Sequence, residues 1–399
     1  MSTALLAALL LASQLLALAL PAGAERDTHP RRALAAPWTL EADRLIGRLP
    51  MSVSVRERGR LVYAHAGNLP RTPASNEKLL LSMALLAHFG PAYRIPTTIE
   101  GLRPTHGIIG GDLWLVGHGD PELNDAALQR LARTLRARGT RAVRGSVIGA
   151  TNTFTRERWA PGWRPIALKF IAIPTALTFD ANSGPGGFVF DPERHAAAAL
   201  TADLRALGVR VGRPAEAGAR PANTRVVAAI RSAPLASILQ RQNLDSLNLD
   251  AEVLTKMLGA AIFGPPGTLA KGARAIRSWA QQRHVTIVAH DGSGLSYANK
   301  ITANGMTRLL AAVNSEPWAR TLRSTLPAAG EGTLTGRLRG LRIRAKTGTL
   351  LERVSALSGW VRLQRWRRWG EVSILSRGLS KPHALALEDR LVSLIATHA

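Results

Sequence analysis

The chain has 399 residues, and its 52 Lys and Arg against 27 Asp and Glu give a net charge of +25; it contains no cysteine. This length predicts two or three domains with a large buried core. The absence of cysteine excludes disulfides and thiolate chemistry, and the excess positive charge favours a polyanionic setting such as a cell wall, anionic lipid or nucleic acid. Arginine supplies 45 of the 52 cations. The few lysines are therefore informative, because lysine can lose its proton and arginine effectively cannot.

The first 24 residues have the pattern of an export signal. An apolar run from Ala4 to Leu20 is followed by Pro21 and by the small residues 22–24, where a signal peptidase cleaves. The first three residues lack the usual Lys or Arg, and the run is as short as a membrane-spanning helix can be, so an uncleaved anchor is the alternative. We predict a cleaved signal peptide over residues 1–24 and an exported protein, periplasmic or associated with the cell wall. Export argues against a nucleic-acid partner.

A mobile lead-in rich in Pro and Arg is expected over residues 25–37, followed by a hairpin. Residues 52–56 and 60–63 alternate between apolar and polar side chains on either side of a turn at 57–59. A helix is then predicted from residues 73–75 to Phe89; it is apolar nearly all round, which indicates burial at the centre of a domain. Gly90 and Pro91 end it.

The sequence pattern changes over residues 97–234, where short strand-like segments and many glycines replace the long helical pattern. This region is therefore predicted to be a β-rich insert. One clear amphipathic helix is expected there, from Asn124 to Gly139. Helical patterns return from Leu235. The remaining expected elements are helices over 249–259, 269–282, 302–313 and 385–397, strands over 285–290, 341–345, 354–363 and 371–376, and a loop over 291–294. Together they predict an α/β (α+β) fold in which helices cover the faces of an antiparallel sheet.

Three short motifs occur in order: Ser75-Asn-Glu-Lys78, Ser246-Leu-Asn248 and Lys346-Thr-Gly348. They match the S-x-x-K, S-x-N and K-T-G motifs of active-site serine acyltransferases. Each motif alone is weak evidence, because Ser75 could simply cap a helix, Lys78 could be a solvated surface lysine, Asn248 could cap the next helix and Lys346 could be a strand-edge lysine. The combination in this order is what indicates a catalytic site.

The chemistry of these motifs is complementary. Ser75 and Lys78 lie three residues apart at a helix start and so share one face, and the serine hydroxyl needs a base that removes its proton. Lys78 becomes that base if burial and a neighbouring cation, for which Lys346 is the candidate, lower its pKa. Ser246 could relay a proton to the leaving amine while Asn248 binds a substrate amide.

The third motif is expected to hold the substrate. Lys346 and Thr347 can bind a carboxylate, and Gly348 lets a substrate backbone approach the strand. The backbone N–H groups of Thr349 and Ser75 can form an oxyanion hole.

Other types of site find little support in the sequence. It has no G-x-S-x-G motif, no clustered His and Asp pattern for zinc and no complete dinucleotide-binding loop, so no metal and no cofactor is predicted. A basic, aromatic segment over residues 365–369 is expected at a hairpin tip, either as a solvated turn or as a contact to an anionic surface.

Several sequence blocks resemble those of the D-alanyl-D-alanine carboxypeptidases/endopeptidases of the penicillin-binding protein 4 type (low-molecular-mass class C). The blocks are Pro73-Ala-Ser-Asn-Glu-Lys-Leu79, Gly119-Asp-Pro-Glu-Leu123, Ala160-Pro-Gly-Trp163, Asp291-Gly-Ser-Gly-Leu-Ser296, Gly332-Thr-Leu334 and Lys346-Thr-Gly-Thr-Leu350. This resemblance implies a penicillin-recognising serine transpeptidase/β-lactamase-like domain, discontinuous over residues 25–96 and 235–399. The β-rich insert over 97–234 then separates the first and second motifs.

The resemblance also implies roles for single residues. Ser75 would be the acylated nucleophile and Lys78 its proton acceptor, Ser246 and Asn248 would complete the second motif, and Lys346 would bind the terminal carboxylate of the substrate. Some relatives carry an acidic residue after the Pro-Gly-Trp block that binds a side-chain ammonium of the substrate. Here Trp163 is followed by a segment with Arg164 and Lys169 and no acid before Asp180. This departure predicts that the enzyme does not depend on a free ammonium in the residue next to the scissile D-Ala.

The function predicted from these observations is that of a serine-type D-Ala-D-Ala carboxypeptidase/endopeptidase that cleaves peptidoglycan stem peptides through a Ser75 acyl-enzyme. Penicillins and other β-lactams are expected to inhibit it by acylation, and its positive surface is expected to contact the anionic cell wall. A β-lactamase and a non-catalytic cell-wall-binding relative are the alternatives.

Overall fold

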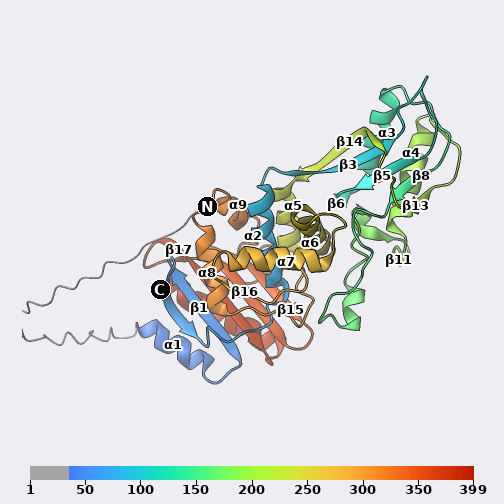
Figure 1. Ribbon diagram of the computed structural model, residues 1–399. Helices are drawn as coiled ribbons and strands as arrows, with labels where there is room; N and C mark the ends of the chain where they lie inside the picture. The colour runs from blue at the N-terminus through green and yellow to red at the C-terminus, as the bar shows by residue number, and fades with distance from the viewer. Residues whose placement is uncertain (1–35) are drawn as a thin grey trace, which may run out of the picture. The chain divides into compact units, whose positions relative to one another are not determined.

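The computed structural model describes residues 36–399 (Figure 1). The predicted signal peptide and nearly all of the predicted lead-in lie outside the described residues. The first described helix, α1 (Pro37–Ile46), was not expected from the sequence; it buries Trp38, Ala42 and Ile46 on one face. No helix among the described residues is long and apolar enough to cross a membrane.

A five-stranded antiparallel sheet forms the framework of the molecule, with the strand order β15-β16-β17-β1-β2. Its strands are β1 (Met51–Glu57), β2 (Arg60–His65), β15 (Ile343–Leu350), β16 (Val354–Leu363) and β17 (Arg368–Arg377). The hairpin predicted around residues 57–59 is present, and Arg58 and Gly59 both have positive φ there. The segment 365–369, expected at a hairpin tip, lies at the turn between β16 and β17 and includes the first two residues of β17. The expected antiparallel sheet is therefore confirmed.

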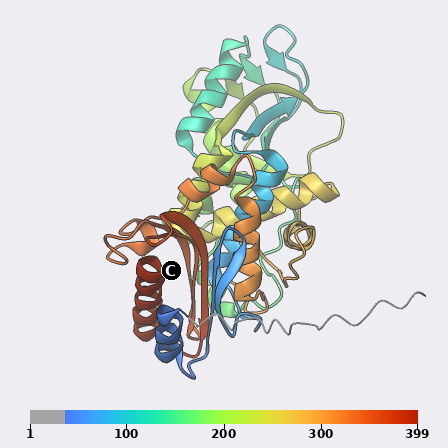
Figure 2. The ribbon, with the colours of Figure 1, turned by 90° about the vertical axis from the view of Figure 1, so that its left-hand side faces the viewer.

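Helices cover both faces of this sheet. The C-terminal helix α10 (Lys381–His398) packs against β16 with α1 beside it, and α8 (Ala303–Val313) packs against β1 and β17. Figure 2 shows α1 and α10 together on one side of the sheet. The central helix α2 (Glu77–Phe89) is buried over its first ten residues and ends at Gly90, where φ is +74°. As predicted, a helix that is apolar nearly all round lies in the middle of the core.

Further helices complete the core around α2. They are α5 (Leu235–Asp245), α6 (Asn248–Phe263), α7 (Leu269–Gln281) and α9 (Ala319–Ser324), with the short 3-10 turns η1 (Ala74–Asn76) and η4 (Gly332–Leu334). One continuous cluster of buried side chains joins these helices to Trp360 and Leu375 of the sheet. The catalytic candidates lie where η1, α2 and α6 meet β15.

Residues 94–234 form a second region with its own sheet, ordered β13-β8-β5-β3-β14. The strands of this region, in that sheet and in smaller ones, are β3 (Arg94–Gly101), β4 (Ile108–Ile109), β5 (Leu113–Gly117), β6 (Asp120–Leu123), β7 (Ala142–Val143), β8 (Val147–Ala150), β9 (Leu177–Phe179), β10 (Ser183–Gly184), β11 (Gly187–Phe188), β12 (Arg210–Val211), β13 (Glu216–Gly218) and β14 (Arg225–Pro234). Its helical elements are α3 (Asp125–Ala137), α4 (Pro192–Ala206), η2 (Pro165–Lys169) and η3 (Asp180–Asn182).

This region has a hydrophobic cluster separate from the one around α2, built from β3, β5, α3 and α4. Residues 154–176, in contrast, contribute Phe154, Trp163 and Ile171 to the cluster around α2. We therefore propose, as the sequence predicts, that residues 97–234 form an inserted domain, with residues 154–176 packed against the main domain.

Three sequence expectations need correction. The predicted strand over 285–290 does not form, because its backbone follows directly from the end of α7, with Val285 N–H bonded to Ala280 O, and makes only an isolated bridge from Val288 to Lys300. The insert contains a second helix, α4, in which the alanine run 196–199 covers buried and exposed positions alike, so the pattern of apolar side chains was weak. Helix α5, which begins at Leu235, was not expected, because the first helix predicted in this part of the chain was the one over 249–259.

Candidate active site

Ser75 lies on the 3-10 turn η1, just before α2 begins at Glu77. Ala74 has a φ of +48°, a left-handed conformation that costs a non-glycine residue free energy and is held here by its surroundings. One neighbour is Gly294, where any side chain would collide with the carbonyl group of Ala74. The loop around Gly294 thus packs directly on the turn that carries Ser75.

Lys78 is fully buried and its ammonium group has three acceptors. Nζ lies 3.3 Å from Ser75 Oγ, 2.9 Å from Asn248 Oδ1 and 2.7 Å from the carbonyl oxygen of Ser293. When the amine is neutral, two N–H bonds can remain on Asn248 and Ser293 while the lone pair faces the hydroxyl of Ser75. The arrangement can therefore take a proton from the serine without moving the lysine.

The pKa of Lys78 is lowered to about 8, mainly because burial disfavours its charged form. The nearby carboxylates of Glu252, Asp291, Asp250 and Glu77 oppose this effect and keep the pKa from falling further. A pKa near the working pH gives a general base both a neutral fraction and enough basicity. The electrostatics of the site thus suit Lys78 to proton transfer.

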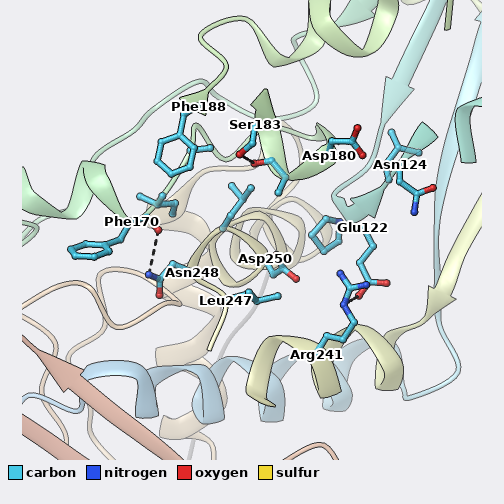
Figure 3. Close-up of a pocket in the computed structure, with 16 residues that line it drawn as sticks. Glu122, Asn124, Phe170, Asp180, Ser183, Phe188, Arg241, Leu247, Asn248 and Asp250 are labelled. Carbon is cyan, nitrogen blue, oxygen red and sulfur yellow. Dashed lines mark hydrogen bonds and ion pairs between the residues drawn. The ribbon is translucent and has the colours of Figure 1, made fainter. Parts of the chain in front are cut away.

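The second motif turns the chain between α5 and α6. Ser246 has left-handed φ and ψ of 58° and 41° at the C-terminus of α5, and Asn248 is the first residue of α6. The N-cap of α6 is Leu247, which has no side-chain cap, so Asn248 does not play the capping role considered from the sequence. Its amide instead accepts from Lys78 and donates to the carbonyl of Phe170 at 3.4 Å (Figure 3).

Lys346 is fully buried on β15, where Nζ donates to the carbonyl oxygen of Thr347 at 3.1 Å. Burial and the positive charge of Lys78 hold its pKa well below the ordinary value for lysine. A substrate carboxylate beside Lys346 would supply the opposite charge and favour the protonated amine. Binding of the carboxylate and protonation of Lys346 are therefore expected to be coupled.

Asn76 links the nucleophile turn to the sheet. Its amide nitrogen can donate to the carbonyl oxygen of Lys346 at 2.8 Å while its oxygen accepts from Ser358 Oγ at 2.8 Å. Asn76 is fully buried. The residue between Ser75 and Glu77 thus fixes the distance between the first and third motifs, a role that the sequence motif alone does not reveal.

Gly348 packs directly against the turn that carries Ser75, and the approach of a substrate backbone to this strand stays a prediction. A Cβ atom at this position would lie 2.8 Å from the carbonyl oxygen of Pro73 and 3.1 Å from the Cβ atom of Ala74. Strand β15 can therefore pack against η1 only when residue 348 has no side chain. Thr349, the next residue, is exposed at the end of the site.

We expect Gly348→Ala to slow acylation by a β-lactam because the extra methyl group pushes β15 away from Ser75. A displacement of 1 Å costs about 10²-fold in rate, and overpacking should reduce stability by about 1–3 kcal/mol. Stopped-flow or gel-based acylation rates, together with thermal unfolding, measure both effects. Gly186→Ala is the control, since no atom lies within 4 Å of a Cβ there. An unchanged acylation rate in Gly348→Ala would contradict this account.

Sequence reasoning missed the buried acids that support Lys78. Glu252 accepts hydrogen bonds from the backbone N–H groups of Gly292 and Ser293, the latter at 2.8 Å, and so fixes the carbonyl group that binds Lys78. Asp291 accepts from Trp163 Nε1 at 2.7 Å and from three further donors in its own loop. Glu252 follows Asn248 by four residues on α6, and this helical spacing was the available signal.

A cavity of about 250 Å³ adjoins the end of β15, lined by Arg164, Ile166, Ala167, Phe170, Leu295, Tyr297, Thr349, Leu350 and Leu351. Arg164 lies over the ring of Tyr297 and forms an ion pair of 2.7 Å with Glu352. The acid that contacts the segment after Trp163, Glu352, is thus already paired with an arginine of that segment. That the enzyme does not depend on a free ammonium next to the scissile D-Ala stays a prediction.

Within residues 36–399, no group of three or more His, Cys, Asp and Glu side chains is arranged to hold a metal ion. The arrangement consists of a serine, two buried lysines, an asparagine and backbone groups. Its chemical capability is nucleophilic attack by a serine activated by an amine.

The sequence model of the D-Ala-D-Ala carboxypeptidase 3 (S13) family matches residues 41–185 and 186–398. The chain belongs to this family. It is therefore a serine-type D-Ala-D-Ala carboxypeptidase, and the predicted enzyme class is confirmed.

Individual relatives agree with the S13 assignment. The chain is 29% identical to a D-alanyl-D-alanine carboxypeptidase of Actinomadura sp. (strain R39), over 86% of this chain and 80% of the relative. It matches the crystal structure of penicillin binding protein 4 of Haemophilus influenzae with a TM-score of 0.79 at 20% identity, covering 89% of this chain and 99% of that one. A penicillin G-acylated predatory endopeptidase of Bdellovibrio bacteriovorus matches with a TM-score of 0.52 at 16% identity, covering 87% and 92%. The predicted fold class and family resemblance are thus confirmed.

Proposed function

We propose that Ser75 is the residue acylated when this S13 peptidase cleaves the D-Ala-D-Ala end, or a D-Ala cross-link, of peptidoglycan stem peptides. The observation that carries this proposal is the buried amine of Lys78, 3.3 Å from Ser75 Oγ and with a pKa of about 8. A serine hydroxyl becomes a useful nucleophile only beside such a base.

The proposed reaction uses the three motifs in sequence. Lys78 takes the proton of Ser75 as Oγ attacks the carbonyl carbon, and the backbone N–H groups of Ser75 and Thr349 stabilise the oxyanion. Lys346 and Thr347 hold the terminal carboxylate. As the C–N bond breaks, Ser246 relays the proton taken up by Lys78 to the leaving amine, and Asn248 orients both Lys78 and a substrate amide. Water then hydrolyses the acyl-enzyme.

The direct test of this function is release of D-Ala from a peptide that ends in D-Ala-D-Ala, measured with and without prior exposure to a penicillin. We expect turnover by the untreated protein and its loss after acylation. A long-lived penicilloyl adduct distinguishes a peptidase from a β-lactamase, which would turn the penicillin over rapidly. The absence of D-Ala release by the folded protein would contradict the proposal.

The pH dependence of acylation should report Lys78. Since only the neutral amine accepts a proton, and its pKa is lowered to about 8, the second-order acylation rate should rise about tenfold per pH unit below pH 8 and level off above it. A neutral-side-chain penicillin and a pH range of 6–9 suit the measurement. A rate that is flat across this range would show that Lys78 is not the base.

We also propose that the protein is exported, by cleavage of its signal peptide, and works against the anionic cell wall. Its net charge of +25 supports this setting, and one stretch of the insert, in and after α3, is especially basic. The exposed arginines of this stretch are Arg130, Arg133, Arg136, Arg138, Arg141 and Arg144. They offer guanidinium groups to phosphate or carboxylate groups of a wall polymer.

Binding of the protein to isolated cell wall is expected to weaken with salt. The Debye length falls from ~10 Å at 0.1 M to ~3 Å at 1 M ionic strength, which screens attraction between exposed charges. Sedimentation of the protein with purified wall at the two salt concentrations measures the effect. Retention that is equal in both would indicate a specific, non-electrostatic contact instead.

A further inference from the structure

A second cavity, of about 400 Å³, lies beside the second motif and is not used by the mechanism above (Figure 3). Its lining comes from β6, from η2 to β11 of the insert, and from α5 and α6 of the main domain. The lining residues are Pro121, Glu122, Leu123, Asn124, Phe170, Ile171, Ala172, Asp180, Ala181, Ser183, Phe188, Arg241, Leu247, Asn248, Leu249 and Asp250. Because Asn248 lines this cavity and also binds Lys78, the cavity adjoins the catalytic groups.

The charged groups of this cavity are predominantly acidic, although the protein as a whole carries a net charge of +25. Glu122, Asp180 and Asp250 face a single cation, Arg241, whose Nε lies 3.1 Å from Glu122 Oε1. Neither Asp180 nor Asp250 forms an ion pair among the described residues, although the positive charges of Arg241 and Lys78 also act on Asp250. A site with this charge favours a positively charged group.

Asp250 is an independent sign that a ligand is expected here. Its side chain is only 5% exposed, and its Oδ2 atom is buried with no hydrogen-bond partner among the described residues. Figure 3 shows it between Leu247 and Glu122 in the cavity. Burial, followed by the negative charge of Glu122, raises its pKa to about 7. A buried carboxylate oxygen without a partner is costly, and a positively charged ligand in the cavity would offset part of that cost through its charge.

The position of the cavity indicates which part of a substrate it would receive. Ser246, which faces the leaving amine in the proposed mechanism, directly precedes Leu247 and Asn248, and both of these line the cavity. The 250 Å³ cavity described above is instead bordered by Thr349, Leu350 and Leu351, at the end of β15. Phe170 lines both cavities, but only the acidic one of the two is bordered by the residues that directly follow Ser246, which favours the leaving-group side for it.

We propose that the acidic cavity is a subsite for the residue that leaves after cleavage, and that Asp250 and Glu122 bind an ammonium group carried by that residue. This inference rests on the proposed function and deepens it. A single D-Ala is too short to place a cationic group there, whereas the leaving strand of a cross-linked peptide is long enough. The subsite thus favours endopeptidase cleavage of substrates with an amine-bearing leaving strand.

Two peptides with the same acyl half test the proposal, one ending in D-Ala-D-Lys and the other in D-Ala-D-Lys acetylated on its side-chain amine. At pH 8 we expect kcat/KM to be at least about tenfold higher for the free amine, equivalent to ~1.4 kcal/mol of transition-state binding. The preference should fall below about threefold in Asp250→Asn and in Glu122→Gln. Glu216→Gln is the matched control, since Glu216 is exposed on the insert and does not line the cavity.

The ratio of the kcat/KM values for the two peptides is unaffected by a general loss of activity. Since two variants are tested, the experiment remains informative if one of them does not fold. Equal rates for the two peptides in the wild-type protein, with D-Ala-D-Ala still cleaved, would overturn the subsite and leave the proposed function intact. A preference that survives both Asp250→Asn and Glu122→Gln would also overturn it, because the amine would then be bound elsewhere. Failure to cleave any of the peptides would instead contradict the proposed function itself.

Discussion

Replacing Ser75 with alanine is expected to lower kcat/KM for D-Ala release by about 10⁴-fold or more, because the nucleophile itself is removed. The substitution should leave the fold intact. Ser75 Oγ has one hydrogen bond, the 3.3 Å contact with Lys78, and Lys78 keeps its bonds to Asn248 and Ser293. Release of D-Ala, measured beside a thermal unfolding curve, checks both statements.

Ser315→Ala is a suitable control for this experiment. Ser315 is an exposed serine after α8, bonded only to the backbone of Ala312, and its loss should change neither activity nor labelling. Substantial residual turnover by a folded Ser75→Ala protein would show that another group is the nucleophile.

The second large effect is expected at Lys78, where arginine should be as damaging as alanine, each lowering the acylation rate by about 10³-fold or more. A general base must be neutral part of the time, and a guanidinium group effectively never is. The three acceptors around Nζ of Lys78 also suit a tetrahedral ammonium or amine group and not the planar guanidinium group of arginine. The measurement is the second-order rate of acylation by a penicillin for both variants at pH 8.

Lys346→Arg provides the contrast. Its proposed role is to present a positive charge to a carboxylate, which arginine retains, so we expect a smaller loss of about tenfold, part of it from fitting a larger side chain into a buried position. If arginine were tolerated equally well at positions 78 and 346, Lys78 would act only as a charge and the proposed proton transfer would be wrong.

The sequence predicted the fold class correctly, but it did not reveal the contacts that the candidate site residues make in the structure. The structure places Ser75, Lys78 and Asn248 within hydrogen-bonding distance of one another through Lys78, although their catalytic roles remain predictions. The carbonyl of Ser293 could not be predicted, because a backbone oxygen carries no residue-type signal. The same holds for Asn76, whose link between η1 and β15 depends on the tertiary packing of two distant segments.

The errors in secondary structure have similar physical causes. Helix α4 was not predicted because its alanine run 196–199 occupies both buried and exposed positions and gives little contrast between the two faces. The segment over 285–290 has the composition of a strand, but no neighbouring strand is in place to pair with it beyond the bridge at Val288. Propensity and pattern are local quantities, and in both cases the tertiary environment decided the outcome.

The central claim, that Ser75 forms the acyl-enzyme, is tested most directly by locating a penicillin adduct on the protein. Trypsin cleavage after Arg71 and Lys78 releases the peptide Thr72-Pro-Ala-Ser-Asn-Glu-Lys78, which contains Ser75 as its single serine. We predict that tandem mass spectrometry finds the penicilloyl mass on this peptide at Ser75. An unmodified 72–78 peptide together with an adduct elsewhere, for example at Ser246 in the peptide over residues 242–256, would contradict the account.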